Sequence, residues 1–204
     1  MEGQFPEAVD ILRSGGIVAF PTDTVYGLGA DATNEGAILK IYAAKKRPLQ
    51  TALPLLLSDA SEIADVARDI PELAWRLAER FLPGGLTLVL YRLPSVSPAI
   101  TGGGDKIAVR VPNHPVPLTL IQCLEKPITG TSANLTGRPN PLAAEDVREQ
   151  MGGSIDLIID GGRCRGDIAS TVVDLTVEPP MILRKGAISR DDIATVCEVR
   201  VKEV

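Results

Sequence analysis

The apolar segments of this chain are short, and their length limits the folds that it can adopt. The longest runs, at residues 53–57 and 86–91, have the length of strands. None approaches the roughly 18–20 residues that a transmembrane helix requires. Between them, apolar residues recur at helical spacing, as at Leu73, Leu77 and Phe81. Strands and helices interleave, although two pairs of strands follow one another directly. This order predicts an α/β fold with a twisted, open mixed sheet flanked by helices.

Local signals place the individual elements. Thr33 or Asn34 can cap one helix, Pro71 suits the first turn of another, and Ser189 with Asp192 opens the last. The glycine-containing segment at residues 21–29 is expected to form a loop. Helices are expected at residues 5–14, 115–124 and 143–150 and after residues 34, 59, 71 and 189. Strands are expected at residues 15–20, 53–57, 86–92, 107–111, 128–131, 157–160, 170–175 and 181–184.

The composition is typical of one domain in a reducing compartment. No break in composition, charge block or low-complexity linker divides the 204 residues, so a single domain over residues 1–204 is expected. No basic segment leads into an apolar one at the start, so no signal peptide is expected. The cysteines (Cys123, Cys164 and Cys197) are odd in number and widely spaced, which argues against a disulfide framework or a zinc knuckle. We therefore expect a cytoplasmic protein with no membrane segment.

The charge distribution favours a local anion-binding region. The formal net charge of −5 argues against a protein that binds nucleic acid over its whole surface. Acidic residues fall mostly on the expected helices, whereas many basic residues fall in glycine- or proline-rich loops and at strand ends. A basic cleft within an acidic protein suits an anionic small molecule. A solvated scatter of charge is the alternative.

Two short segments carry most of the functional signal. Residues 45–48 read KKRP and place Lys45 and Arg47 two positions apart at a helix end. Residues 131–140 read TSANLTGRPN and place Ser132 two positions before Asn134. Cations beside hydroxyl and amide groups suit the oxygens of a nucleotide phosphate. If the fold joins the two segments, they form a polyanion pocket without a Walker loop; taken alone, the cations are also typical of a helix C-terminus.

Other segments are weaker signals. Residues 101–105 (TGGGD) lack the Lys and Ser/Thr of a phosphate loop. Arg110 ends an expected strand, where ligands of α/β proteins usually bind. His114 is the only histidine, so a metal cluster built on histidines is excluded. Cationic neighbours favour a lowered pKa of the Cys164 thiol, but no partner base is evident.

Taken in order, these segments resemble the YrdC family. The resemblance runs from PTDTVYGLG through KKRP, VRVPNHP, TSAN with GRPN and STVVDLT to ILRKGAI, and so covers about residues 15–188. Enzymes of this family make L-threonylcarbamoyladenylate. Longer relatives carry a further C-terminal domain, whereas this chain resembles the single-domain TsaC type.

The resemblance implies a YrdC-like fold with a deep cationic cleft and a nucleotidyltransferase activity. It implies ATP, L-threonine and bicarbonate as substrates, Mg²⁺ with the ATP, pyrophosphate as leaving group, and N6-threonylcarbamoyladenosine in tRNA as the purpose. It implies no protein-held metal site. The catalytic residues that it implies are Lys45, Arg47, Ser132 and Asn134. The residues that it places around L-threonine are Thr24, Arg110 and Ser170. Those that it places around ATP are Lys45, Arg47, Thr51, Ser132, Asn134, Asn140 and Arg184.

The sequence departs from the family at some positions, and some roles stay open. Ala52 follows Thr51 where many relatives have proline, and Gly130 and Lys106 lie where some relatives use hydroxyl side chains. Asp23 and Asp174 are candidates for the general base.

Alternative functions from other classes also stay open. One is an RNA-binding module that uses the same cleft, although aromatic residues for stacking are scarce at 3%. Another is a domain that transfers a carbamoyl group from carbamoyl phosphate. Direct tRNA contact, or partner proteins that modify tRNA, are possible partners.

Overall fold

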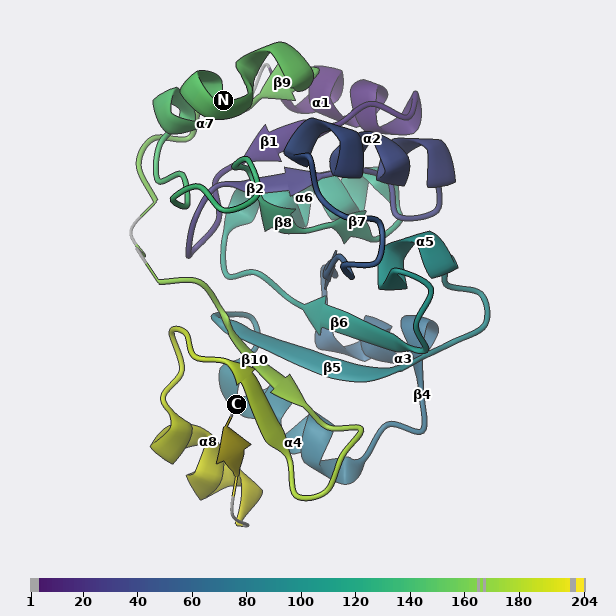
Figure 1. Cartoon of the computed structure of the whole chain (residues 1–204), viewed down its shortest axis with the longest axis vertical. Helices are drawn as coiled ribbons and strands as arrows, with labels where there is room; N and C mark the ends of the chain where they lie inside the picture. Colours follow the sequence, from purple (N-terminus) through teal and green to yellow (C-terminus); the bar gives the residue numbers. More distant parts are fainter. Residues whose placement is uncertain (1–3, 165, 167, 199–200, 204) are drawn as a thin grey trace.

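The computed structural model describes residues 4–164, 166, 168–198 and 201–203. The chain forms two stacked halves, each built on its own mixed β-sheet, with the helices packed on the outside (Figure 1). The first strands and helices make up the half that is uppermost in Figure 1, and the C-terminal strands belong to the lower half. The prediction of an α/β fold with open mixed pairing flanked by helices is confirmed, with the strands divided between two sheets.

The helices of the described residues follow the expected order. The α-helices are α1 (Gln4–Arg13), α2 (Glu35–Lys45), α3 (Ile63–Val66), α4 (Glu72–Phe81), α5 (Pro98–Thr101), α6 (Pro115–Leu124), α7 (Ala144–Met151) and α8 (Arg190–Cys197). Two short 3-10 helices are η1 (Ala60–Glu62) and η2 (Gly152–Ser154). None of the described helices is both long enough and apolar enough to span a bilayer.

The smaller sheet lies in the upper half. Its strands, in spatial order, are β8 (Thr131–Ser132), β2 (Gly27–Gly29), β1 (Val18–Phe20) and β9 (Leu157–Ile158). Strand β2 pairs antiparallel with both β1 and β8, whereas β9 runs parallel to β1. The pairing of Gly27 with Ser132 brings residues 21–29 beside residues 131–140, although the two segments are distant in sequence.

The larger sheet forms the lower half and the wall between the halves. Its strands, in spatial order, are β12 (Lys202–Glu203), β11 (Met181–Arg184), β10 (Thr171–Asp174), β5 (Leu86–Arg92), β6 (Lys106–Arg110), β3 (Leu55–Leu56) and β7 (Ile128–Thr129), with β4 (Ala67–Arg68) paired to β5. Strand β5 is antiparallel to β6 and parallel to β10.

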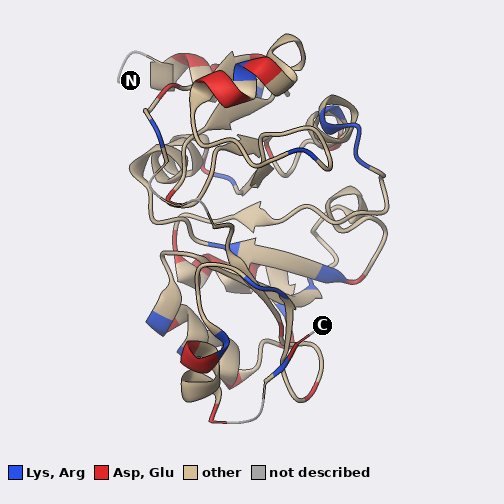
Figure 2. Cartoon of the chain, turned by 60° about the vertical axis from the view of Figure 1, so that its left-hand side comes forward, with Lys and Arg blue, Asp and Glu red and all other residues tan. Residues whose placement is uncertain are grey.

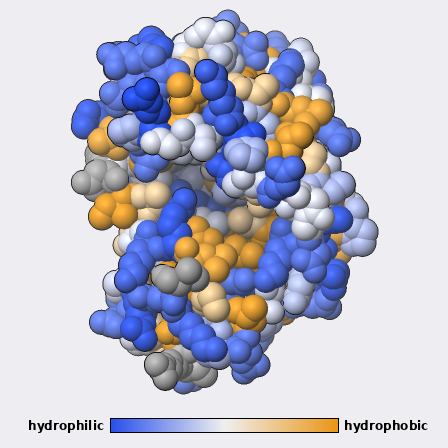
Figure 3. Space-filling view, viewed as in Figure 1, coloured by the Kyte–Doolittle hydropathy of each residue, from blue (hydrophilic) through white to orange (hydrophobic). Residues whose placement is uncertain are grey.

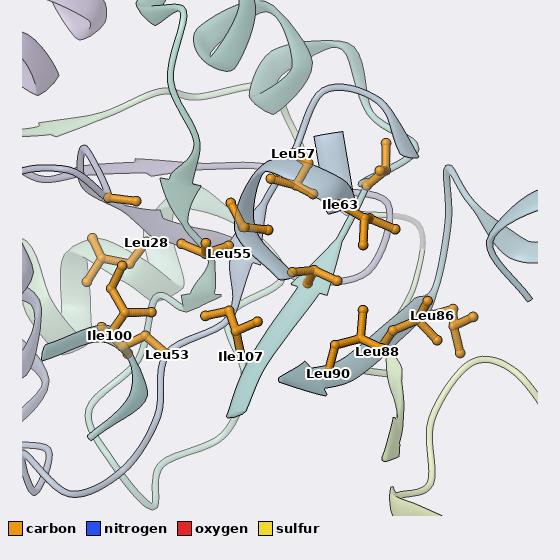
Figure 4. Close-up of a cluster of buried hydrophobic side chains, with 14 of the residues drawn as sticks. Leu28, Leu53, Leu55, Leu57, Ile63, Leu86, Leu88, Leu90, Ile100 and Ile107 are labelled. Atoms are coloured by element: carbon orange, nitrogen blue, oxygen red, sulfur yellow. The ribbon is translucent and has the colours of Figure 1, made fainter. Parts of the chain in front are cut away.

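Alternation along β5 gives the larger sheet two different faces. Leu86, Leu88 and Leu90 point into the main hydrophobic cluster, where they lie near Ile107 and Leu55 (Figure 4). The residues between them point to the opposite face, because side chains alternate along a strand. Each fully buried leucine of this kind contributes about 1.5–3 kcal/mol through burial. The sheet is therefore anchored on one face and leaves the other face for the space between the halves.

Local caps explain where several helices begin and end. The side chain of Asn34 accepts from the backbone N–H of Ala37 at the start of α2, and Lys46 ends that helix in the left-handed conformation. Ser189 accepts from the N–H of Asp192 at the start of α8, as predicted. His114 caps α6 in the same manner through Nδ1, which is a structural role.

Two expectations for local structure were wrong, and both concern the smaller sheet. Residues 27–29 form strand β2 within the segment expected to be a loop. The single strand expected at residues 128–131 is two strands in different sheets, β7 and β8, which are separated by Gly130. A Cβ atom at Gly130 would collide with the side chain of Leu56, so a larger residue here would require Leu56 to move.

Candidate active site

A cavity of about 330 Å³ lies between the two halves of the molecule. Figure 3 shows it as a hollow at the middle of the front face, with apolar residues on its lower side. Seven residues predicted to bind substrates line it: Thr24, Arg47, Arg110, Ser132, Asn140, Ser170 and Arg184. The sequence segments predicted to converge therefore do converge on one cavity.

The outward face of the larger sheet forms the floor of the cavity. Thr87 and Val89 come from β5, Ala108 and Arg110 from β6, and Val172 from β10. All lie at alternate positions in their strands, so the same periodicity that buries the leucines exposes these residues to the cavity. The floor combines small apolar side chains with a few polar ones, a combination that is typical of small-molecule sites.

Arg110 stands at the end of β6 with part of its hydrogen-bonding capacity unused. Its Nε donates to the carbonyl of Gly84 at 2.9 Å, Nη1 donates to Thr24 Oγ1 at 3.0 Å, and Nη2 donates to Asp23 Oδ1 at 2.7 Å. A guanidinium has five N–H groups, so one hydrogen remains on each terminal nitrogen. Arg110 is only 8% exposed and lines the cavity, so its remaining N–H groups are available to an anionic group such as a carboxylate.

Arg47 and Arg184 bring two further guanidinium groups to the cavity. Arg184 Nε and Nη2 donate to the carbonyl of Ser170 at 3.0 and 2.8 Å, which leaves Nη1 without a partner among the described residues. Arg47 Nη2 donates to the carbonyl of Ala52 at 2.9 Å, and its buried Nε has no partner within the described part of the chain. Both arginines therefore have N–H groups to offer a ligand.

The arginines repel one another across the cavity. Burial, followed by the proximity of Arg110 and Arg47, lowers the pKa of Arg184. Burial also lowers the pKa of Arg110, and the adjacent carboxylate of Asp23 offsets part of that effect. Figure 2 shows basic segments on strands and loops around the middle of the molecule. An anionic ligand would relieve this repulsion, so the site is suited to more than one negative group.

Lys45 lies behind the cavity wall. It is 2% exposed and does not line the cavity. Its ammonium donates to the carbonyls of Ser132 and of Asn134, the latter at 2.7 Å, and to Asn134 Oδ1 at 3.3 Å. Burial, and then the nearby Arg47, lowers the pKa of Lys45 from 10.5 to about 7. Lys45 therefore fixes the loop after β8 from within.

The side chains of the Ser-x-Asn pair also form hydrogen bonds within the protein. Ser132 Oγ donates to Asn134 Oδ1 at 2.6 Å, and Asn134 Nδ2 donates to the carbonyl of Arg138 at 2.5 Å. Asn134 is 6% exposed and lies outside the cavity lining. In this arrangement the Ser132 hydroxyl presents acceptor lone pairs to the cavity. The hydroxyl hydrogen of Ser132 is therefore committed to Asn134, whereas one hydrogen of Asn134 Nδ2 has no partner among the described residues.

Three other residues named from the sequence lie away from the cavity. Thr51 is exposed in the loop after α2, and its backbone carbonyl accepts from Tyr42. Lys106 is paired with Asp174 at 3.0 Å, outside the cavity lining. Burial alone would raise the pKa of Asp174, but hydrogen bonds from Thr176 and Lys106 outweigh it and lower the pKa. Asp174 is therefore a weak candidate for a base, and Asp23 is occupied by Arg110 and by the N–H of Asn113.

The expected lowering of the pKa of Cys164 was wrong. Burial, the largest cause, raises the pKa of its thiol, and nearby Arg163 offsets only part of this. The second cationic neighbour in the sequence, Arg165, lies outside the described residues. Cys164 is buried and suits a structural role.

Thr87 was not among the residues predicted from the sequence to form the site. Its hydroxyl lies 2.7 Å from Ser170 Oγ, and its side chain is 2% exposed. The signal was present, because a polar residue between Leu86 and Leu88 marks the non-core face of the strand. Within the described residues, no group of three or more His, Cys, Asp or Glu side chains is arranged to hold a metal ion.

Comparison with known proteins yields close similarities over nearly the whole chain. A family model described as "Telomere recombination" and named for Sua5, YciO and YrdC matches residues 10–186. The threonylcarbamoyl-AMP synthase of Pyrococcus abyssi (strain GE5 / Orsay) is 46% identical over 195 residues, covering 95% of this chain and 57% of that protein. The protein of the same name from Bacillus subtilis (strain 168) is 43% identical over 194 residues, covering 95% of this chain and 56% of that one.

A solved structure shares the fold. The structure of P. abyssi Sua5 complexed with L-threonine is similar with a TM-score of 0.94 and 45% identity, covering 98% of this chain and 59% of that one. The chain spans somewhat more than half the length of the curated relatives above.

Proposed function

Because the chain belongs to the Sua5/YciO/YrdC family, we propose that it is a nucleotidyltransferase that converts L-threonine, bicarbonate and ATP into L-threonylcarbamoyladenylate, pyrophosphate and water. One observation carries this proposal: Arg47, Arg110 and Arg184 converge on a single cavity of about 330 Å³. Such a site suits two negatively charged reactants, a polyanionic nucleotide and an anionic amino-acid derivative, since the guanidinium groups offset the repulsion between them. The relatives named above as threonylcarbamoyl-AMP synthases supply the identity of the reactants.

The amino acid occupies the floor of the cavity in this proposal. Its carboxylate binds the two unused N–H groups of Arg110, and Ser170 and Thr24 flank it. Bicarbonate takes up a proton and loses water to give CO₂. The neutral amine of threonine adds to the carbon of CO₂ and releases a proton, which forms a carbamate that is labile in water. Binding in the cavity between the two halves limits the access of water to this intermediate.

The nucleotide occupies the cationic rim. Arg47 and Arg184 bind phosphate oxygens, while Ser132 and Asn140 border the same end of the cavity. A carbamate oxygen attacks the α-phosphorus of ATP, the bond from that phosphorus to the bridging oxygen breaks, and pyrophosphate leaves. The arginines stabilise the negative charge that accumulates in this step. Lys45, with Asn134, holds the Ser132 loop in place and acts through it.

The metal ion in this proposal arrives with the substrate. Mg²⁺ is usually held by substrate phosphates with one or two carboxylates. No carboxylate is among the described residues that line the cavity, and Asp23, which lies beside Arg110, is already paired with it. The described residues do not fit a site built by the protein alone, and no step above is assigned to the ion.

The proposal extends to the fate of the product. An acyl adenylate hydrolyses readily, so a protein that modifies tRNA must consume it, directly or in a complex with this chain. The described cysteines are unpaired, which suits the reducing cytoplasm as the compartment. An RNA-binding module is not favoured, because the arginines converge on one cavity of about 330 Å³ instead of forming a track for a nucleic-acid backbone.

Product analysis tests the proposed function. The purified chain is incubated with ATP, Mg²⁺, L-threonine and bicarbonate, and the nucleotides are separated by chromatography. Pyrophosphate and a threonylcarbamoyl adenylate are expected, and each should disappear when L-threonine or bicarbonate is omitted. Formation of ADP and phosphate, or turnover that is independent of L-threonine, would overturn the proposal.

A further inference from the structure

Thr87 reaches the cavity from the middle of the larger sheet. It lies on β5 opposite Val172 of the parallel strand β10, and its hydroxyl is 2.7 Å from that of Ser170. Among the described residues, the Ser170 hydroxyl is the only hydrogen-bond partner of the Thr87 hydroxyl. At 2% exposed, Thr87 is too buried for its hydroxyl to be satisfied by bulk water.

The hydrogen bonds around Ser170 set the direction of this contact. Arg184 Nη2 donates to Ser170 Oγ at 2.9 Å and so occupies one of its two lone pairs. If Thr87 donates, it fills the second lone pair, and the hydrogen of Ser170 is left for the cavity. If Ser170 donates instead, the hydrogen of Thr87 has no acceptor in the described part of the chain. The first arrangement satisfies every donor once an anion is bound.

We propose that Thr87 is a positioning residue, which donates to Ser170 and thereby turns the Ser170 hydroxyl hydrogen toward the carboxylate of the bound amino acid. This inference rests on the proposed function, because it takes the amino acid to lie beside Arg110 and Ser170. The chain of contacts runs from Arg184 through Ser170 to Thr87, so the serine is held from both sides. In this proposal Thr87 acts through Ser170, although it also lines the cavity.

The test compares Thr87→Val with Thr87→Ser by calorimetric titration of L-threonine and, separately, of ATP. Valine keeps the β-branched shape and removes the hydroxyl, whereas serine keeps the hydroxyl. Thr87→Val should raise the Kd for L-threonine about tenfold, the loss expected when a hydrogen bond to a charged group is weakened. The Kd for ATP should stay within about twofold, and Thr87→Ser should restore L-threonine binding. In turnover, KM for L-threonine should rise while kcat changes little.

A double-mutant cycle separates positioning from direct contact. In a Ser170→Ala background, Thr87→Val should have no further effect on L-threonine binding, because the residue through which Thr87 acts is gone. Additive effects would overturn the inference and make Thr87 a substrate contact. Thr87→Ala replaces Thr87→Val if the valine variant does not fold, and melting temperatures report on folding throughout.

The outcomes also separate the two proposals. If the unaltered chain binds L-threonine and Thr87→Val binds it equally well, the inference fails and the proposed function stands. If the unaltered chain does not bind L-threonine, both fail.

Discussion

The two walls of the cavity use their polar groups in opposite ways. In and behind the upper wall, Lys45 and Ser132 donate all their side-chain hydrogens to Asn134 and to backbone carbonyls. In the lower wall, Arg110 keeps two N–H groups unused at the cavity, although it is nearly as buried as Lys45. Burial alone therefore does not separate a structural cation from a binding one.

The difference shows that residues of one sequence motif can have different roles, one in stabilising the fold and another in binding the ligand. Lys45 and Arg47 are neighbours in KKRP, yet α2 ends between them and sends them in different directions. Lys45 points back into the protein, and Arg47 reaches the cavity. Lys45, which holds the loop after β8, is expected to affect mainly the free energy of unfolding. The arginines that face the cavity are expected to affect mainly ligand binding.

The largest effect expected is on stability. Lys45→Met should lower the free energy of unfolding by about 3 kcal/mol, because buried carbonyls of the loop lose their donor. For a chain of this size the melting temperature should fall by about 6–12 °C, measured by calorimetry. Lys46→Met is the matched control, since Lys46 is exposed, and it should change stability by less than about 0.5 kcal/mol. Equal stability of the two variants would contradict a structural role for Lys45.

The next effect concerns the binding wall. Arg47→Ala should leave stability within about 1 kcal/mol, because the side chain makes one hydrogen bond to the described chain, at Ala52. It should weaken ATP binding about 30-fold, which corresponds to about 2 kcal/mol. Arg138→Ala removes an exposed arginine outside the cavity lining and should bind ATP normally. A large fall in melting temperature for Arg47→Ala would assign Arg47 to the structural class.

Stability should also depend on pH through Lys45. The unfolded chain keeps the Lys45 proton up to its usual pKa of 10.5, whereas burial lets the folded chain release it at about pH 7. Between these values the unfolded state binds more protons, so stability rises with pH by up to about 1.4 kcal/mol per pH unit. The free energies of unfolding of the unaltered chain and of Lys45→Met, measured with urea at several pH values, should differ by an amount that changes with pH at this slope. Parallel pH profiles would mean that folding does not lower the pKa of Lys45.

The smallest effect expected is at His114, outside both walls. His114→Ala should cost about 1 kcal/mol through loss of the α6 cap, whereas His114→Asn should keep most of it. Burial lowers the pKa of His114 from 6.5, so the stabilisation is present above pH 6.5 and is lost as the pH falls through the lower folded value. Thermal unfolding at several pH values measures this. Loss of L-threonine-dependent turnover in His114→Asn would contradict a purely structural role.

Much of the fold could be predicted from local signals. The bounds of α6 and β11 were predicted, as was the Ser189 cap of α8. Strand β2 was missed because Gly27 and Gly29 indicate a turn, and only pairing with the distant β1 and β8 makes the segment a strand. The division of strands into two sheets depends on such long-range pairing, which leaves no periodic signal. The expectation of a single domain over residues 1–204 stays a prediction.

The site could be predicted as a set of segments, but not as a set of contacts. The position of Arg110 near a strand end indicated a ligand site, whereas Ser170 and Arg184 were implied by the family resemblance; all three line the cavity. Nothing in the sequence distinguishes the orientation of Lys45 from that of Arg47, since this depends on where α2 ends against the loop of Ser132. The role of Thr87 depends on the pairing of β5 with β10, which brings its hydroxyl to Ser170.

The most direct test of this division of roles is a crystal structure with L-threonine and a non-hydrolysable ATP analogue bound. The threonine carboxylate should lie on the two free N–H groups of Arg110, and phosphate oxygens should contact Arg47 and Arg184. The Lys45 ammonium should remain on the carbonyls of Ser132 and Asn134. Phosphate bound directly to the Lys45 ammonium, or ligands outside the cavity, would contradict the account.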